Sequence, residues 1–138
     1  MHKMKQGVMV WVLACMTVCG CKAPQQEQND ERYGLEDSLI VDYYLMGVDG
    51  RYAQCVASMH SCDGTTQAYK DQVTLALKQR NASVGKQKRG VKHVGVERVT
   101  FHADHTMANV FLNVAYNDGS QEEVLFPLVL DKGIWRMQ

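Results

Sequence analysis

The fold is decided by one stretch, Lys92–Gln138, which has the sequence KHVGVERVTFHADHTMANVFLNVAYNDGSQEEVLFPLVLDKGIWRMQ. Its first part, His93–Phe101, is rich in β-branched and aromatic residues and is followed by polar turn residues, which predicts a strand. Met107–Tyr116 alternates apolar and polar side chains, the pattern of a strand with one buried face. The residues expected on that face are Val110, Leu112, Val114 and Tyr116.

Two more strands complete this region. An Asp-Gly pair ends the second strand and supplies the positive φ angles that a hairpin turn needs. Gln121–Leu130 is apolar on both faces after Val124, which predicts a third strand covered on both sides. Pro127 has no N–H and therefore indicates a bulge or a sheet edge. Ile134–Met137 follows another turn as a short last strand, so the region predicts an antiparallel meander of four strands.

Three helices are expected ahead of this sheet. Leu35–Met46, Arg51–Met59 and Thr66–Arg80 carry apolar residues at helical spacing, and Thr65 or Thr66 is suited to cap the third helix. The next segment, Asn81–Lys92, contains glycine and basic residues and is expected to be a connection. Helices segregated before an antiparallel sheet are typical of an α+β domain with its helices on one sheet face. The residues expected to face inward are Leu35, Leu39, Tyr43 and Met46 in the first helix, Tyr52, Cys55, Val56 and Met59 in the second, and Tyr69, Val73, Ala76 and Leu77 in the third.

The N-terminus has the form of an export signal. Lys3 and Lys5 precede an apolar run that is shorter than the ~20 residues of a membrane-spanning helix. The residues that follow, Val18-Cys19-Gly20-Cys21, resemble a bacterial lipobox, which implies that Cys21 becomes the lipidated first residue. An ordinary secretory signal cleaved nearby is the alternative. We expect a signal peptide at 1–20, a polar flexible tether at 21–32 and one folded domain at 33–138, held at the cell membrane or outer membrane on its periplasmic or surface side.

Several short segments of the chain resemble a known family, the small Bacteroidetes-type lipoproteins of domain-of-unknown-function family 4878. The resemblance implies a nuclear transport factor 2-like (NTF2-like), or cystatin-like, fold, in which a curved four-stranded sheet wraps around helices and leaves a cone-shaped cavity. It brings no catalytic motif with it. The segments that carry the resemblance are Tyr43–Gly47, Asp49–Ala53, Gly90–Lys92, Asp104–Val110, Tyr116–Ser120 and Lys132–Arg136.

Two cysteines are expected to keep free side chains after processing, Cys55 and Cys62. They either form a disulfide, which requires the helix to end between them, or are two separate buried thiols. Together with His60 and Asp63 they include zinc-ligand types, but their spacing fits no standard zinc pattern. The cluster His102-Ala103-Asp104-His105 favours a solvated turn over a metal or acid-base site. We therefore expect no metal and no cofactor.

Charge patterning excludes some partners. The chain has 15 basic and 15 acidic residues, and nothing in this balance suggests nucleic acid. A run without acidic residues between Asp71 and Glu97 favours a solvated basic loop, with an anionic partner as the alternative. Its basic residues are Lys78, Arg80, Lys86, Lys88, Arg89 and Lys92.

These features together favour a lipid-anchored cell-envelope domain that binds a small molecule or a protein and is not an enzyme. A hydrolase or isomerase using the cone is the alternative, and it requires a carboxylate beside a tyrosine or histidine inside the cavity; Asp42 would serve only if it pointed inward. A homodimer through the sheet is a third hypothesis, based on Phe111, Val124 and Phe126. The aromatic residues expected to line a pocket, or else to be core, are Tyr43, Tyr52, Tyr69, Phe111 and Trp135.

Overall fold

The structure is a computed structural model that describes residues 32–138. The predicted signal peptide, the lipidation site Cys21 and nearly all of the predicted tether lie outside the described residues. Within them, Leu35–Gln138 forms one compact unit. In this part of the chain no helix is long and apolar enough to cross a membrane.

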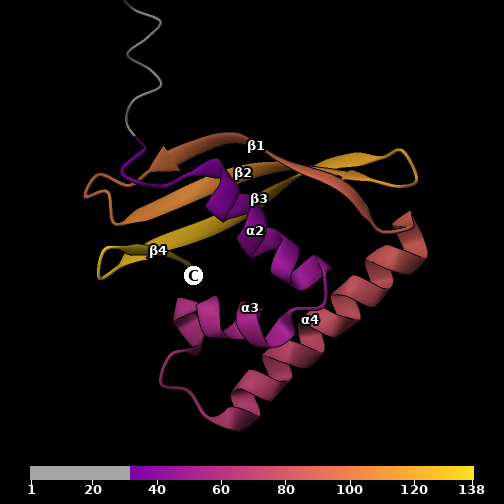
Figure 1. Cartoon of the computed structure of the whole chain (residues 1–138), viewed down its shortest axis with the longest axis horizontal. Helices are drawn as coiled ribbons and strands as arrows, with labels where there is room; N and C mark the ends of the chain where they lie inside the picture. The colour runs from indigo at the N-terminus through magenta and orange to yellow at the C-terminus, as the bar shows by residue number, and fades with distance from the viewer. Residues whose placement is uncertain (1–31) are drawn as a thin grey trace, which may run out of the picture. The chain divides into compact units, whose positions relative to one another are not determined.

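Three α-helices precede a four-stranded antiparallel sheet in the described chain, as the sequence predicts (Figure 1). All three helices lie on the same side of the sheet, so the domain is an α+β structure with two layers. A 3₁₀ turn, η1, links the second and third helices. The elements are α2 (Asp37–Val48), α3 (Tyr52–Ser58), η1 (His60–Cys62), α4 (Gln67–Lys88), β1 (Val91–Phe101), β2 (Met107–Tyr116), β3 (Gln121–Asp131) and β4 (Ile134–Met137).

The strands pair in chain order, β1-β2-β3-β4. Between Val96 and Arg98 the register of β1 against β2 shifts, which leaves Glu97 as a bulge that increases the local twist. At the last turn Lys132 and Gly133 both have positive φ, as a two-residue hairpin requires. The bulge therefore bends β1, and the tight turn joins β3 directly to β4.

The core lies between β2 and the helices. Every second residue of β2 is buried, which confirms the face predicted for this strand and adds Ala108 to it. From the helical layer, Ile40, Tyr43 and Met46 of α2 join the same cluster. A period-2 face packed on a helical face thus produces one continuous core.

The predicted connection at 81–92 is wrong, because α4 continues to Lys88. Thr66 caps its start by accepting a hydrogen bond from the Tyr69 N–H at 3.1 Å, as predicted. Its end is set by Arg89 and Gly90, which both have positive φ and donate backbone hydrogen bonds to the last turn. Of the six basic residues, four therefore lie on α4, Arg89 lies in the turn after it, and Lys92 lies on β1.

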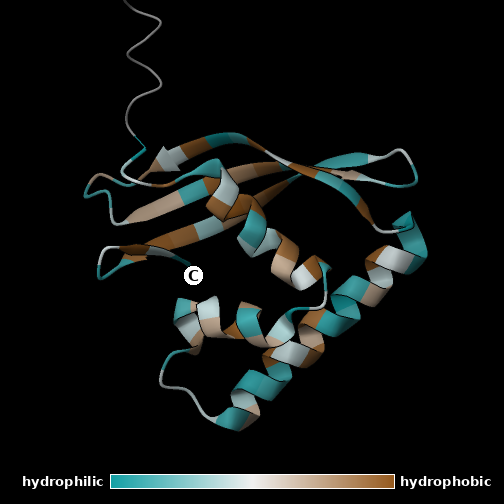
Figure 2. Cartoon of the chain, viewed as in Figure 1, coloured by the Kyte–Doolittle hydropathy of each residue, from teal (hydrophilic) through white to brown (hydrophobic). Residues whose placement is uncertain are grey.

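Three burial predictions also need correction. Tyr69 and Ala76 are exposed, and α4 has no fully buried residue, since it packs on its neighbours along a narrow stripe. Figure 2 shows α4 as mostly hydrophilic, with hydrophobic colour concentrated in its middle. β3 is not covered on both faces either: Leu125 and Pro127 are exposed, because the helices cover only the inner face. Pro127 lies at a local edge, just beyond the last β3–β4 pair.

Candidate functional site

A cavity of about 230 Å³ lies between the helices and the inner face of β3. Most of its walls are apolar, and its polar groups come from tyrosine, arginine and asparagine side chains. It contains no aspartate, glutamate or histidine among its lining residues. These residues are Tyr43, Tyr44, Gly47, Val48, Cys55, Met59, Leu77, Arg80, Asn81, Val84, Val91, Val124, Leu125, Phe126 and Met137.

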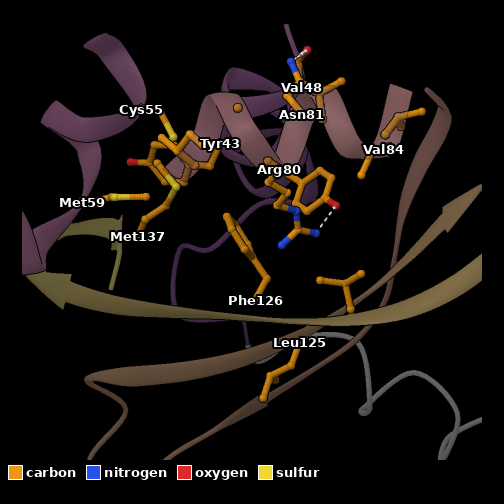
Figure 3. Close-up of a pocket in the computed structure, with 15 residues that line it drawn as sticks. Tyr43, Val48, Cys55, Met59, Arg80, Asn81, Val84, Leu125, Phe126 and Met137 are labelled. Atoms are coloured by element: carbon orange, nitrogen blue, oxygen red, sulfur yellow. Dashed lines mark hydrogen bonds between the residues drawn. The ribbon is translucent and has the colours of Figure 1, made fainter. Parts of the chain in front are cut away.

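One end of the cavity is apolar and fixed to the core. Cys55, Tyr43, Met59 and Met137 gather there, as Figure 3 shows. The Tyr43 hydroxyl donates a hydrogen bond of 2.6 Å to the Trp135 carbonyl, and burial raises the pKa of this phenol. Since that hydroxyl is already engaged, Tyr43 contributes mainly its ring to the wall.

The other end of the cavity carries the polar groups. Arg80 donates from Nη2 to the Tyr44 hydroxyl at 3.3 Å (Figure 3). Asn81, next along α4, donates from Nδ2 to the Val48 carbonyl and to the Tyr52 hydroxyl, each at 3.1 Å. These bonds fix α4 against α2 and α3 and hold the guanidinium of Arg80 at the cavity.

Two neighbouring residues of β3 point in opposite directions at the cavity. Phe126 points inward, where its ring meets the edge of Tyr44 at a centroid distance of 5.7 Å, whereas the Leu125 side chain points away (Figure 3). Val124 shares the inner face with Phe126, because strand residues alternate. Val124 and Phe126 face the cavity, so they cannot support a dimer through the outer face of the sheet. Phe111 lies on the outer face and still can.

The structure places one of the five predicted pocket residues, Tyr43, in the cavity wall. Tyr52 is not a lining residue, but its hydroxyl accepts a hydrogen bond from Asn81, which is. Tyr69 is an exposed residue of α4. Phe111 is on the outer sheet face beneath the Arg98 guanidinium, 3.9 Å from the ring centroid. Trp135 is core, beside Phe101 at 5.8 Å between centroids.

Sequence reasoning missed Arg80 and Asn81 as cavity residues, because they fall at the expected end of the third helix. A signal for them exists. Leu77, Asn81 and Val84 follow the i, i+4, i+7 spacing of one helical face, which continues past the expected helix end.

The carboxylates expected for acid-base chemistry are not in the cavity. Asp42 is exposed and pairs with Arg51 at 3.1 Å, so it does not point inward. A carboxylate does meet a tyrosine elsewhere: Tyr116 donates a short hydrogen bond to Glu122, and burial followed by this bond raises the pKa of Tyr116. Neither residue of this pair lines the cavity, and Glu122 is exposed.

In the structure Cys55 and Cys62 are free, buried thiols on α3 and η1. Burial raises the pKa of Cys55, with a further contribution from Cys62, so the two groups lie within electrostatic reach. These two thiols therefore add no support for a zinc site. His60, Asp63 and Asp131 do approach within 4.8 Å of one another.

The guanidinium of Arg136 already occupies this cluster of His60, Asp63 and Asp131. Arg136 contacts both acids, with Nη2 2.9 Å from Asp63 and Nη1 3.2 Å from Asp131, and it also donates to the Ala57 carbonyl at 3.1 Å. The guanidinium thus balances the carboxylates and ties β4 to the end of α3.

The residues at 102–105 form the predicted exposed turn, where Asp104 accepts hydrogen bonds from the N–H and hydroxyl of Thr106.

Comparison with known proteins supports the fold. No protein-family model matches the chain, and no curated protein matches it. Among solved structures, the chain is similar to a Campylobacter jejuni protein provisionally described as an NTF2-like transpeptidase, with a TM-score of 0.58 and 17% identity over 72% of this chain and 94% of that one. The domain therefore has an NTF2-like α+β fold. A match at this sequence identity supports the fold alone.

Proposed function

We propose that this protein is a lipid-anchored cell-envelope protein whose NTF2-like domain binds a small, largely apolar molecule in its cavity without transforming it. The observation that carries the proposal is the cavity itself, about 230 Å³ with mostly apolar walls and a few polar groups at one end. This combination is typical of ligand sites, although the volume lies below the roughly 300 to 1,000 Å³ of sites for drug-sized molecules. A small ligand fits best.

The side chains of the cavity support binding over catalysis. General acid-base chemistry needs a group that exchanges protons near the working pH, and the lining offers no carboxylate or imidazole. Its thiol, Cys55, has a pKa raised by burial, so the nucleophilic thiolate is disfavoured. The proposed non-enzymatic role rests on these two features.

Blocking the cavity tests the proposal. Val84 lines the cavity from α4, and its neighbour Ser83 is exposed outside it. Native mass spectrometry of the protein purified from its own host should show an additional bound mass in the wild type and in Ser83→Trp. Val84→Trp should lose that mass, because the indole fills the space. The proposal fails if wild type and both variants carry the same mass, or none.

The lipid anchor has its own test. Cys21→Ser removes the thiol that the lipobox resemblance assigns to lipidation, so the variant should leave the membrane fraction and enter the soluble extract. Cys19→Ser, two residues earlier, is the matched control and should stay in the membrane. Equal membrane retention of both variants would contradict the anchor while leaving the cavity proposal intact.

A further inference from the structure

We propose that Arg80 is an anion anchor and that the cavity takes the tail of a medium-chain fatty carboxylate, whose head group binds the Arg80 guanidinium. This inference rests on the proposed function, because it names the class of molecule that the cavity would bind. It is carried by a juxtaposition: a cation without a carboxylate partner lies at one end of an apolar space.

The charge of Arg80 is not balanced within the part of the chain that the structure describes. Arg51, Arg98 and Arg136 all form ion pairs with carboxylates there. Arg80 forms none in that region, and its side chain makes one hydrogen bond, to the neutral hydroxyl of Tyr44. A guanidinium has five N–H donors in a planar fork, so most of them stay available to a ligand.

Tyr44 positions this cation. Its hydroxyl accepts from Arg80, and its ring rests edge-on against Phe126, which rises from β3 into the cavity. The contact holds the guanidinium beside the apolar walls, while Arg80 itself stays exposed to solvent. The same hydroxyl keeps its own O–H donor, which can bind a second oxygen of an anionic head group.

The surroundings of Arg80 also favour an anion. The ammonium of Lys88, two turns further along α4, lies 4.6 Å from the ring centroid of Tyr116 on the same inner side of the sheet. The acidic group of this region, Glu122, accepts from Tyr116, and no hydrogen bond or ion pair among the described residues joins it to Arg80. A cationic head group would be repelled by the charge of Arg80. A carboxylate can instead accept two parallel hydrogen bonds from its planar guanidinium.

The far end of the cavity suits an unbranched tail. Its walls come from Met59 and Met137, with the ring of Tyr43 beside them, and Leu77 and Val124 add further apolar surface to the cavity. Methionine side chains are flexible and polarisable, so they adapt to an alkyl chain of variable path. The modest volume limits the tail to medium length, and we take decanoate as the probe.

Photo-crosslinking in a bilayer tests this assignment on the full chain. The protein is reconstituted in phosphatidylcholine nanodiscs with decanoic acid that carries a diazirine at its tail, and labelled residues are identified by mass spectrometry. We expect labels on lining residues such as Phe126 and Met137. Unlabelled decanoate should displace the probe at least about tenfold better than decanol of equal length, because a charge-assisted hydrogen bond distinguishes them.

Variants separate the head-group contact from the cavity. Arg80→Gln should weaken labelling by about tenfold or more, and Tyr44→Phe should weaken it less, because the ring stays on Phe126 and only the hydroxyl is lost. Lys86→Gln removes one positive charge from an exposed site of the same helix outside the cavity and should leave labelling unchanged. Thermal unfolding midpoints check that each variant is folded.

The outcomes distinguish this inference from the proposed function. Labelling of lining residues that decanol displaces as well as decanoate, and that Arg80→Gln leaves intact, would overturn the anion anchor while supporting an apolar ligand site. Better displacement by decyl phosphate than by decanoate would overturn the carboxylate assignment. Absence of labels from the cavity with the acid probe and with a diazirine analogue of decanol would overturn both proposals.

Discussion

Trp135 is a residue for which sequence and structure lead to a quantitative test. Its side chain is 3% exposed, its ring packs beside Phe101, and its carbonyl accepts the Tyr43 hydroxyl. Trp135→Ala should therefore lower the free energy of unfolding by about 3–5 kcal/mol, measured by urea denaturation. Its neighbour Ile134 is 60% exposed, so Ile134→Ala should change stability by no more than about 0.5 kcal/mol. Equal effects of the two substitutions would contradict the core role of Trp135.

Asp63 gives a pH-dependent prediction. The hydrogen bond from Arg136 is the main cause that lowers the pKa of this carboxyl below its ordinary value of 3.8. A lowered folded pKa means that the interaction stabilises the fold fully above that ordinary value and is lost as pH falls through the folded pKa. Asp63→Asn should thus be less stable than wild type near neutral pH, and the gap should narrow below about pH 4. Urea denaturation at a series of pH values measures the gap; a constant gap would refute the pairing.

Among the elements, α4 is the one whose length sequence reasoning missed, and glycine substitutions test it. Gly85 lies inside the helix, and an added Cβ there would meet no atom within 4 Å. Gly85→Ala should raise the unfolding free energy by about 0.5–1 kcal/mol, since alanine favours the helix and restricts the unfolded chain.

Gly90 is the matched contrast for Gly85. It has a φ of +89°, which L residues rarely adopt, so Gly90→Ala should destabilise the protein by about 1–2 kcal/mol. The same urea denaturation measures both variants. If residues 81–92 were instead a flexible connection, both substitutions would have small effects, and that result would contradict the long helix.

The sequence predicted those elements whose signals are local. Alternation in β2 follows from the pleat, and the turn at Lys132 and Gly133 from its residue types, so both were found correctly. The second half of α4 was missed because its inward positions include the polar Asn81, whose partners Val48 and Tyr52 come from other helices. Because Asn81 interrupts the apolar periodicity, only Leu77 and Val84 carry the apolar signal of this helical face.

At the scale of the whole molecule, the cavity was predicted in kind but not in its residues. Its walls combine α2, α3, α4, β1, β3 and β4, and no sequence spacing relates Arg80 to Phe126 or Met137. These contacts depend on how far each helix extends and on which face of β3 points inward. Both are outcomes of packing, so the site could be assembled only from the folded chain.

Self-association is the last whole-molecule question, and the chain contains a matched pair of residues for it. A homodimer through the sheet is a proposal that now depends on the outer face, where Leu125 and Phe111 pair across β2 and β3. Leu125 and Leu75 are both 55% exposed, but Leu75 lies on α4.

Leu125→Glu should therefore convert a dimer of residues 33–138 to a monomer, because it would bury two carboxylates at the interface, whereas Leu75→Glu should leave it dimeric. Light scattering across a range of concentrations measures the mass. Dissociation by Leu75→Glu alone would place the interface on α4, and a monomeric wild type at every concentration would exclude the dimer, because then the outer face of the sheet has no second copy to cover it.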